Sequence, residues 1–337
     1  MRTFLIAIAL LLGIMFIIGQ FAEVQAIVET LQKGDWRFLF LALCVQGLWL
    51  VVVALTYRTI FQAIGLEETL DKLILLSAAA FFVNVIAPTA GVSGMAVFIS
   101  QARQRGYSTG KVTAAGVLYL LFDYASFLCV LTLGLIVLIR RNNLNTPDIV
   151  ASGILLAIAS IMAFLMYLGT QSAIRLGNAL AKIARLVNRV MKPFIHRDYL
   201  SEKRAHEYAN EVGEALQEIS KKPNNLISPA LLLLTNKGLL ISILLLTFLA
   251  FKVPFSIGTL VAGFSIGYLF LIVSPTPSGI GFVEGALTLA LSSLYVPLGA
   301  AAVLTLAYRG ITFWAPLLFG MLAVRLLSRS SEIKTII

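Results

Sequence analysis

Charged residues are scarce in this chain of 337 residues. Only 12% of the residues are charged, whereas 59% are hydrophobic, and the mean hydropathy is +0.93. Soluble domains carry about 25% charged residues and do not reach this hydropathy. The composition therefore excludes a soluble globular protein and predicts an all-α polytopic membrane protein.

Cysteine is nearly absent, and the familiar cofactor motifs are missing. The two cysteines, Cys44 and Cys129, lie within apolar runs, which excludes a disulfide-stapled scaffold and a cysteine-rich zinc domain. The sequence contains no HExxH, CxxC, P-loop or dinucleotide fingerprint. We therefore expect no metal site, no cofactor and no nucleotide-driven pumping.

Histidine is almost as rare, and this bears on whether the chain is an enzyme. The string around Ser93 is similar to the intramembrane rhomboid protease signature, but His196 and His206 lie outside every apolar run. A serine nucleophile needs a neighbouring base. Without a histidine in a span, no catalytic dyad is expected in the membrane.

Long apolar runs are what the sequence does contain. A helix needs about 20 apolar residues to cross the hydrocarbon core. About six runs satisfy this length: Phe4 to Phe21, Phe38 to Tyr57, Val112 to Ile139, Ile149 to Gly169, Pro229 to Phe251 and Leu298 to Val324. Although Arg2 precedes the first run, we interpret this run as a span and not as a cleaved signal peptide.

Two further apolar regions, 73–100 and 255–296, are interrupted by proline and glycine. In each, a Pro-Thr pair is followed by two glycines, so each region is expected to break into two half-length helices. Backbone freed at a break cannot face lipid and must face protein or a wet cavity. The breaks therefore predict a binding site that includes Asn84, Pro88, Gly91 and Gly94 in the first region and Pro275, Pro277, Gly279 and Gly281 in the second.

The order of spans repeats along the chain. A full span, a broken hairpin and a full span occur in 36–140, and the same order returns in 229–326. If each broken hairpin re-enters on its own side, the two repeats have inverted topology, as in transporters that bind substrate near the midplane. The alternative is that Phe282 to Val296 crosses the membrane as a separate span.

The basic residues predict the orientation of one integral membrane domain over 1–337. In the inverted-repeat arrangement, nineteen of the 26 Lys and Arg lie on one side and five on the other, while Lys237 and Arg309 fall within helices. The positive-inside rule then places both termini in the cytoplasm. The net charge of +10 thus indicates orientation, and no nucleic acid partner is expected.

The segment 170–228 is the longest polar stretch and holds ten basic residues. It is too short for a catalytic domain and predicts two amphipathic helices, near 173–192 and 201–222. A basic amphipathic helix is typical of contact with an anionic lipid surface. The alternative is that these charges serve topology alone.

Three ionisable residues lie within apolar regions, where they cannot help to orient the chain in the membrane. Asp123 and Arg309 lie near the middle of their spans, and Glu284 follows the second break. A charge at bilayer centre costs ~2.5 to 3.5 kcal/mol on insertion scales, so such groups need partners or wet surroundings. We hypothesise that they line one cavity with Asn84, in which Arg309 holds an anionic headgroup. The alternative is an internal Asp123–Arg309 or Glu284–Arg309 pair that locks helices together.

At these positions the chain resembles the flippase-like family named for the transmembrane domain of lysylphosphatidylglycerol synthase, the multiple peptide resistance factor. The resemblance rests on the break from Pro88 to Gly94, on Asp123, on the string Pro277-Ser-Gly279-Ile-Gly281-Phe-Val-Glu284, and on Arg309 with Gly310. Ser278 stands where glycine is common in the family.

The resemblance implies movement of a phospholipid or related lipid, anionic or aminoacylated, between leaflets of a prokaryotic cytoplasmic (inner) membrane. It does not imply the synthase reaction, which belongs to a cytoplasmic aminoacyltransferase domain that these 337 residues lack. A separate synthase polypeptide and a homo-oligomer remain open as partners. The sequence thus predicts a lipid flippase or scramblase working by alternating access. The alternatives are a non-transporting scaffold for lipid or glycan synthesis and, third, a channel.

Overall fold

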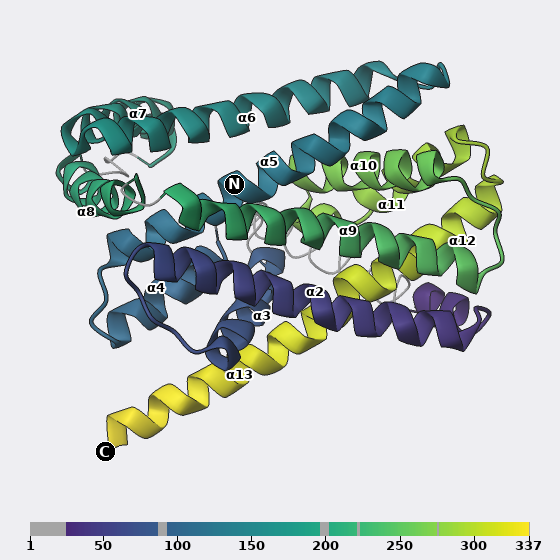
Figure 1. Ribbon diagram of the computed structural model, residues 1–337, viewed down its shortest axis with the longest axis horizontal. Helices are drawn as coiled ribbons and strands as arrows, with labels where there is room; N and C mark the ends of the chain where they lie inside the picture. The colour runs from purple at the N-terminus through teal and green to yellow at the C-terminus, as the bar shows by residue number, and fades with distance from the viewer. Residues whose placement is uncertain (1–24, 87–92, 196–201, 221–222, 275, 337) are drawn as a thin grey trace.

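The computed structural model describes residues 25–86, 93–195, 202–220, 223–274 and 276–336. Every regular element in these ranges is a helix, which confirms the all-α class (Figure 1). After a helical segment at 25–31, the elements are α2 (Trp36–Ala63), α3 (Leu70–Ile86), α4 (Met95–Gln104), α5 (Thr109–Arg140), α6 (Thr146–Gln171), α7 (Ala173–Ile195), α8 (Glu202–Ser220), η1 (Pro223–Leu226), α9 (Ile227–Ala250), α10 (Ile257–Val273), η2 (Pro277–Gly279), α11 (Phe282–Ser293), α12 (Leu298–Arg309), the π-helical η3 (Gly310–Trp314) and α13 (Ala315–Ile336).

Five of the described helices are long and apolar enough to cross a membrane. They are Trp36–Ala63, Thr109–Arg140, Thr146–Gln171, Asn224–Ala250 and the continuous run Leu298–Ser328. Four of them contain an expected span whole, and the helix Asn224–Ala250 contains the expected span Pro229 to Phe251 except for its last residue. The first expected span, Phe4 to Phe21, lies outside the described residues.

Polar side chains at the helix starts fix where these long helices begin. The Asp35 carboxylate accepts a hydrogen bond from the backbone N–H of Arg37 and caps α2. Ser108 caps α5 and Ser256 caps α10 in the same way. A side-chain acceptor satisfies a backbone donor that the first helical turn leaves free.

The long helices pack into a bundle by burying small and aliphatic side chains. α2 lies along α9, α5 along α10, and α3 along α13. Gly320 on α13 allows the last of these crossings, since a Cβ there would collide with the carbonyl oxygen of Ala78. In contrast, α6 leaves much of its apolar surface exposed, including Phe164 at 59%. In water such a face would be an aggregation site, whereas in a bilayer it faces lipid.

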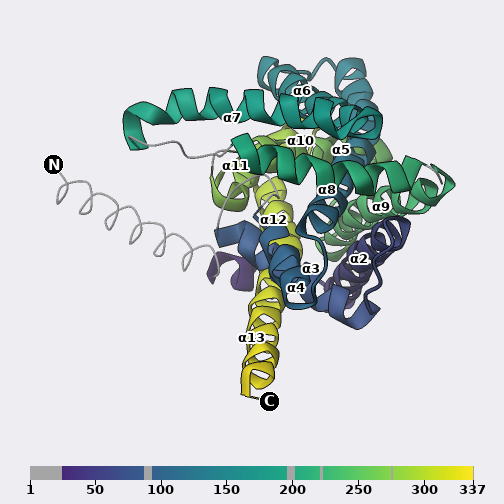
Figure 2. The same ribbon diagram turned by 90° about the vertical axis from the view of Figure 1, so that its left-hand side faces the viewer.

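The loops gather at two opposite ends of the bundle. The start of α2, the end of α9 and the α5–α6 turn lie at the right-hand end in Figure 1. There the Asp35 N–H donates to the carbonyl of Ala250, and the Asn143 side-chain amide donates to the carbonyl of Ser293. At that end the start of α2 is thereby joined to the end of α9, and the α5–α6 turn to the end of α11. The other end carries the α2–α3 and α4–α5 connections together with α7 and α8, and Figure 2 looks onto it.

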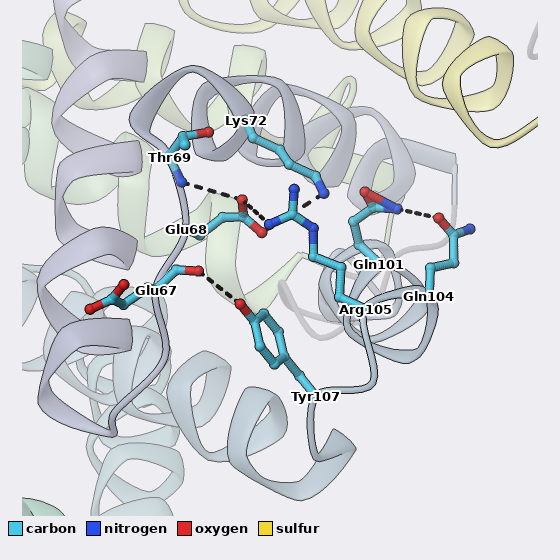
Figure 3. Close-up of polar contacts among 8 residues, drawn as sticks. All are labelled: Glu67, Glu68, Thr69, Lys72, Gln101, Gln104, Arg105 and Tyr107. Carbon is cyan, nitrogen blue, oxygen red and sulfur yellow. Dashed lines mark hydrogen bonds and ion pairs between the residues drawn. The ribbon is translucent and has the colours of Figure 1, made fainter. Parts of the chain in front are cut away.

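A polar cluster joins the two connections at this second end (Figure 3). Arg105 forms an ion pair with Glu68 at 2.8 Å, and Lys72 lies 3.8 Å from the same carboxylate. The hydroxyl of Tyr107 donates to the carbonyl oxygen of Glu67 at 3.0 Å. These contacts hold the α2–α3 connection against the turn that leads into α5.

The segment 170–228 contains two helices, α7 and α8, that pack against each other, and α8 also packs on α5. Glu211 of α8 accepts hydrogen bonds from Ser108 Oγ and from the Gly110 N–H, both at 2.7 Å. Gly110 is required at this contact, because a Cβ there would collide with the Glu211 Cβ. The start of α5 is therefore capped from outside by α8. Which side of the membrane this segment faces stays a prediction.

Both interrupted regions form two helices, as their proline and glycine content predicts. α10 and α11 pack closely because Gly263 and Gly267 on α10 face Leu291 and Leu287 on α11. The chain reverses between them through three positive φ values, 49° at Ser278, 73° at Gly279 and, after Ile280, 76° at Gly281. In the first region α3 packs on α4, while the residues between them lie outside the described ranges.

Candidate functional site

A cavity of about 420 Å³ lies where the two interrupted regions meet the long helices. Its walls come from α2, α3, α5, α9, α10 and the α12–η3 junction. Eight aromatic residues contribute to the wall: Trp49, Tyr57, Phe81, Tyr119, Tyr124, Tyr268, Tyr308 and Phe313. Its polar and charged residues are Ser77, Asn84, Asn236, Ser274, Thr276, Ser278, Thr312, Asp123 and Arg309, and aliphatic residues and glycines form the rest. Cavities of this size, largely apolar with a few polar groups, are typical of ligand sites.

Asp123 on α5 is held by two donors from other helices. Lys237 on α9 donates from Nζ to Asp123 Oδ1 at 2.5 Å and to the Tyr268 hydroxyl at 2.7 Å. Tyr268 on α10 in turn donates to Asp123 Oδ2 at 3.2 Å. Lys237 is 0% exposed and Asp123 8% exposed. The three side chains therefore form a closed triangle joining α5, α9 and α10, in which each charge has an opposite charge beside it.

Arg309 at the end of α12 forms the second ion pair. Its Nε donates to Glu284 Oε1 at 2.5 Å, and its Nη2 donates to the carbonyl oxygen of Ser278 at 3.1 Å. The guanidinium also lies over the Phe313 ring, 4.5 Å from the ring centroid. This carbonyl is available because the positive φ at Ser278 takes the chain out of helical hydrogen bonding. Arg309 therefore binds the break between α10 and α11 to α12.

The helix itself changes at Arg309. The next five residues, Gly310–Trp314, form a π-helical turn before α13 begins. π-turns are rare inside helices and frequently occur at functional sites. Gly310 is needed here because a Cβ would lie 2.7 Å from Ile27 Cγ2 of the first described helix. The Arg309 guanidinium thus lines the cavity directly before this π-helical turn, which is the only irregular turn between Leu298 and Ile336.

Asn84 and Gly94 close the first break on the cavity side. The Asn84 side-chain oxygen accepts hydrogen bonds from the Gly94 N–H at 2.6 Å and from the Ser93 hydroxyl at 2.8 Å. Gly94 allows this approach, since a Cβ would lie 2.7 Å from Asn84 Nδ2 and 2.9 Å from the Ala80 carbonyl. Asn84 on α3 thereby satisfies a backbone donor at the start of α4.

Three side chains of the cavity wall carry a buried polar atom that has no hydrogen-bond partner among the described residues. They are the indole N–H of Trp49, the hydroxyl of Ser77 and the amide nitrogen of Asn236. Ser77 and Asn236 are buried, with 5% and 2% exposure. An unsatisfied buried polar group is costly, and a water or ligand that reaches into the wall beside these residues would satisfy it. All three groups donate, so they suit a ligand that brings acceptor oxygens.

The residues singled out from the sequence have different positions around this cavity. Asn84, Gly94, Asp123 and Arg309 line it. Glu284, Gly279 and Gly281 are at the second break beside it, and η2 begins at Pro277. Pro88, Gly91 and Pro275 lie outside the described residues. The structure does not pair Asp123 with Arg309, because each has its own partner.

Sequence reasoning missed Lys237 and most of the wall. The charge count places Lys237 within a helix and on neither side of the membrane, and a lysine within a span is itself a signal of a buried pair. Nothing in the sequence indicated that Trp49, Ser77 and Asn236 share a cavity, because they come from α2, α3 and α9. Their proximity is a product of helix packing.

Comparisons with known proteins agree with this membrane fold. The sequence matches the family described as the lysylphosphatidylglycerol synthase TM region over residues 4–320. It is also similar to a UPF0104 membrane protein of Pyrococcus horikoshii, with 24% identity over 318 residues that cover 90% of this chain and 91% of that protein. The matched range contains the positions of both ion pairs and of the whole cavity wall. The chain therefore belongs to the family of the lysylphosphatidylglycerol synthase transmembrane region.

Proposed function

We propose that the protein moves a phospholipid between the leaflets of a prokaryotic cytoplasmic membrane. The observation that carries the proposal is the cavity, which presents charged and polar groups inside a bundle of apolar helices. A lipid crossing a bilayer must shield its headgroup while its acyl chains can stay in hydrocarbon. The cavity takes the headgroup, and the acyl chains remain outside the bundle.

Alternating access between two inverted halves is the mechanism we propose. The cavity wall draws on α2, α3 and α5 from the predicted repeat 36–140 and on α9, α10 and the α12–η3 junction from the predicted repeat 229–326. The α2–α3 and α4–α5 connections lie at one end of the bundle, and the α9–α10 and α11–α12 connections at the other (Figure 1). This arrangement suits two re-entrant hairpins that open to opposite sides. Rocking of the halves would open the cavity to each leaflet in turn.

Transport is favoured over synthesis by the chemistry of the wall. The family description names a synthase of lysylphosphatidylglycerol, which is itself a phospholipid. The charged groups at this cavity are engaged in ion pairs, whereas acyl transfer needs a nucleophile with a base beside it. That the protein is not an enzyme stays a prediction.

The segment 170–228 is proposed to face the cytoplasm, where α7 contacts anionic lipid. On α7, Ile183 is 41% exposed between the exposed basic residues Lys182 and Arg185. An exposed apolar side chain among basic ones suits the headgroup region of a membrane. Dependence of vesicle binding by the isolated segment on anionic lipid content would test this contact.

Reconstitution into liposomes tests the proposed transport directly. Acyl-labelled fluorescent phospholipids are incorporated, and dithionite added outside reduces only those in the outer leaflet. Vesicles that contain the protein are expected to lose the protected fluorescence of the inner leaflet, whereas protein-free vesicles keep it. Unchanged protection would instead support a scaffold, and solute uptake or conductance without lipid movement would support a channel.

A further inference from the structure

The charges around the cavity balance, and their placement follows a pattern. One carboxylate, Asp123, and one guanidinium, Arg309, line the wall. Their partners Lys237 and Glu284 contact them at 2.5 Å but are not among the described residues that form the wall. Each charge at the wall is thus backed by an opposite charge, and the four groups sum to zero.

This balance disfavours a headgroup with net charge. A charge that enters a weakly polar cavity loses its hydration and needs an opposite charge to replace it. Arg309 considered alone would suit an anionic lipid, but Glu284 already neutralises it. Asp123 considered alone would suit a cationic lipid, but Lys237 already neutralises it. Either kind of lipid would leave one uncompensated charge among the helices.

We propose that the substrate is a zwitterionic phospholipid whose headgroup carries one ammonium and one phosphate. This inference rests on the proposed function and specifies its substrate. Such a headgroup adds no net charge, and it offers each group at the wall an opposite partner. The phosphate lies toward Arg309 and the ammonium toward Asp123. Each ligand group can add to the internal ion pair or replace one of its members, and the net charge of the cavity stays zero in both cases.

The wall supplies further groups suited to each half of this headgroup. The two hydrogen bonds of Arg309 to protein use two of its five N–H groups. The buried donors of Trp49, Ser77 and Asn236, which lack a partner among the described residues, suit phosphate and ester oxygens. Near Asp123, the Tyr119 ring lines the wall; one of its faces is covered by Tyr57 at 4.4 Å between centroids, and Tyr57 is itself covered on its other side by Phe98, so the second face of Tyr119 is the one that no ring of this stack covers. Aromatic faces attract an ammonium ion, as Lys237 already shows over Tyr268 at 4.2 Å.

The experiment compares three acyl-labelled lipids in the same reconstituted vesicles. Phosphatidylethanolamine is zwitterionic, phosphatidylglycerol is anionic, and lysylphosphatidylglycerol has net positive charge. The wild-type protein is expected to move phosphatidylethanolamine fastest. Equal or faster movement of either charged lipid would overturn the inference while leaving the proposed transport intact. Movement of none of the three would instead overturn the proposed transport itself.

A single charge substitution provides the sharper test. Glu284→Gln keeps the shape of the side chain and its acceptor oxygen for Arg309 but leaves the cavity with one excess positive charge. The rate of phosphatidylglycerol relative to phosphatidylethanolamine is expected to rise roughly tenfold, as expected for one uncompensated charge near a ligand. Lys237→Met leaves one excess negative charge, so the same ratio is expected to fall.

A matched control separates cavity charge from overall charge. Glu68→Gln removes the same charge in the cluster of Figure 3, where Glu68 pairs with Arg105 away from the cavity wall. It is expected to leave the lipid ratio unchanged. An equal shift in Glu68→Gln, or no shift in a folded Glu284→Gln protein, would overturn the inference. If Glu284→Gln does not fold, Asp123→Asn gives the same sign of excess charge and replaces it.

The last part of the experiment uses a soluble form of the same headgroup. Glycerophosphoethanolamine carries the ammonium and phosphate without acyl chains. Exclusion of this solute from vesicles that move phosphatidylethanolamine supports a lipid substrate. Its uptake without lipid movement would show that the cavity serves a solute, and the lipid assignment would be wrong.

Discussion

At the scale of single residues, Asp123 shows how the fold keeps a charge inside a bundle of apolar helices. Its carboxylate receives one bond from Lys237 and one from Tyr268, and these two residues also bond to each other. Removal of one member of a buried pair leaves the other charge uncompensated, which costs more than removal of both. The stability of single and double variants therefore measures how strongly the pair holds α5 and α9 together.

The Asp123–Lys237 pair gives the first prediction. Lys237→Met is expected to destabilise the protein by about 3 to 5 kcal/mol, because Asp123 then remains buried without its cation. The double substitution Asp123→Asn with Lys237→Met is expected to recover most of that loss, since it removes both charges. Apparent melting temperatures of the purified proteins in one detergent measure both effects.

Transport by the double variant separates the two roles of the pair. If Asp123 binds the headgroup, the double variant regains stability but not lipid translocation. A double variant that transports at the wild-type rate would show that the pair only holds α5 and α9 together. Measurement at equal protein per vesicle excludes differences in reconstitution.

Backbone strain at the second break gives another residue-scale prediction. Ser278 has φ 49°, a left-handed conformation that costs a non-glycine residue about 1 to 2 kcal/mol. Ser278→Gly is expected to raise the apparent melting temperature, by the equivalent of up to about 1 kcal/mol after the entropic cost of glycine. Transport is expected to persist, because the carbonyl that accepts from Arg309 belongs to the backbone.

The glycines next to Ser278 serve as matched comparisons. Gly281 has φ 76° and open space where a Cβ would lie, so Gly281→Ala tests strain alone. At Gly279 a Cβ would also collide with the side chain of Val283, so Gly279→Ala adds a steric clash. The expected order of stability is Ser278→Gly, wild type, Gly281→Ala, Gly279→Ala. Any other order would contradict the strain argument.

At the scale of elements, the sequence predicted what composition and turn chemistry determine. Five expected spans are present because about 20 apolar residues suffice to specify a membrane helix. The break at Gly279 and Gly281 was predictable because their positive φ suits glycine. The pairing of Asp123 with Lys237, 114 residues apart, was not, since no local pattern records which faces of two helices meet.

The contact between α8 and α5 gives a prediction about elements. Glu211→Ala removes the acceptor for Ser108 and for the Gly110 N–H at the start of α5. Loss of a cap costs about 1 kcal/mol, and here it also loosens α8 from α5. We expect faster limited proteolysis within α7 and α8, measured on the reconstituted protein. Glu214→Ala, at an exposed position of the same helix, is the control and should cleave at the wild-type rate.

At the scale of the whole molecule, the fold separates the loops in the way that the charges require. Three parts of the chain that are expected inside lie at one end of the bundle: the connections 64–69 and 105–108 and the helices α7 and α8 (Figures 1 and 2). Those expected outside, around Asp35, Asn143 and Ser256, lie at the other, where Arg141 donates to Ser256 at 2.9 Å. From the sequence, each loop could be assigned to a side of the membrane only by its charge. The packing of the helices puts the same loops together at each end of the bundle, and this observation does not depend on charge.

This grouping gives the last prediction, which concerns orientation. In a background with Cys44 and Cys129 replaced by serine, single cysteines at Asn142 and Lys252 are expected to react with a membrane-impermeant maleimide added to intact cells. Single cysteines at Arg103 and Glu214 are expected to react only after the membrane is opened, because the positive-inside rule predicts that the basic end of the molecule faces the cytoplasm. All four positions are exposed, so differences in reaction report the side of the membrane. Labelling of Glu214→Cys in intact cells would reverse the orientation, and labelling of both ends from outside would contradict a bundle that spans the membrane.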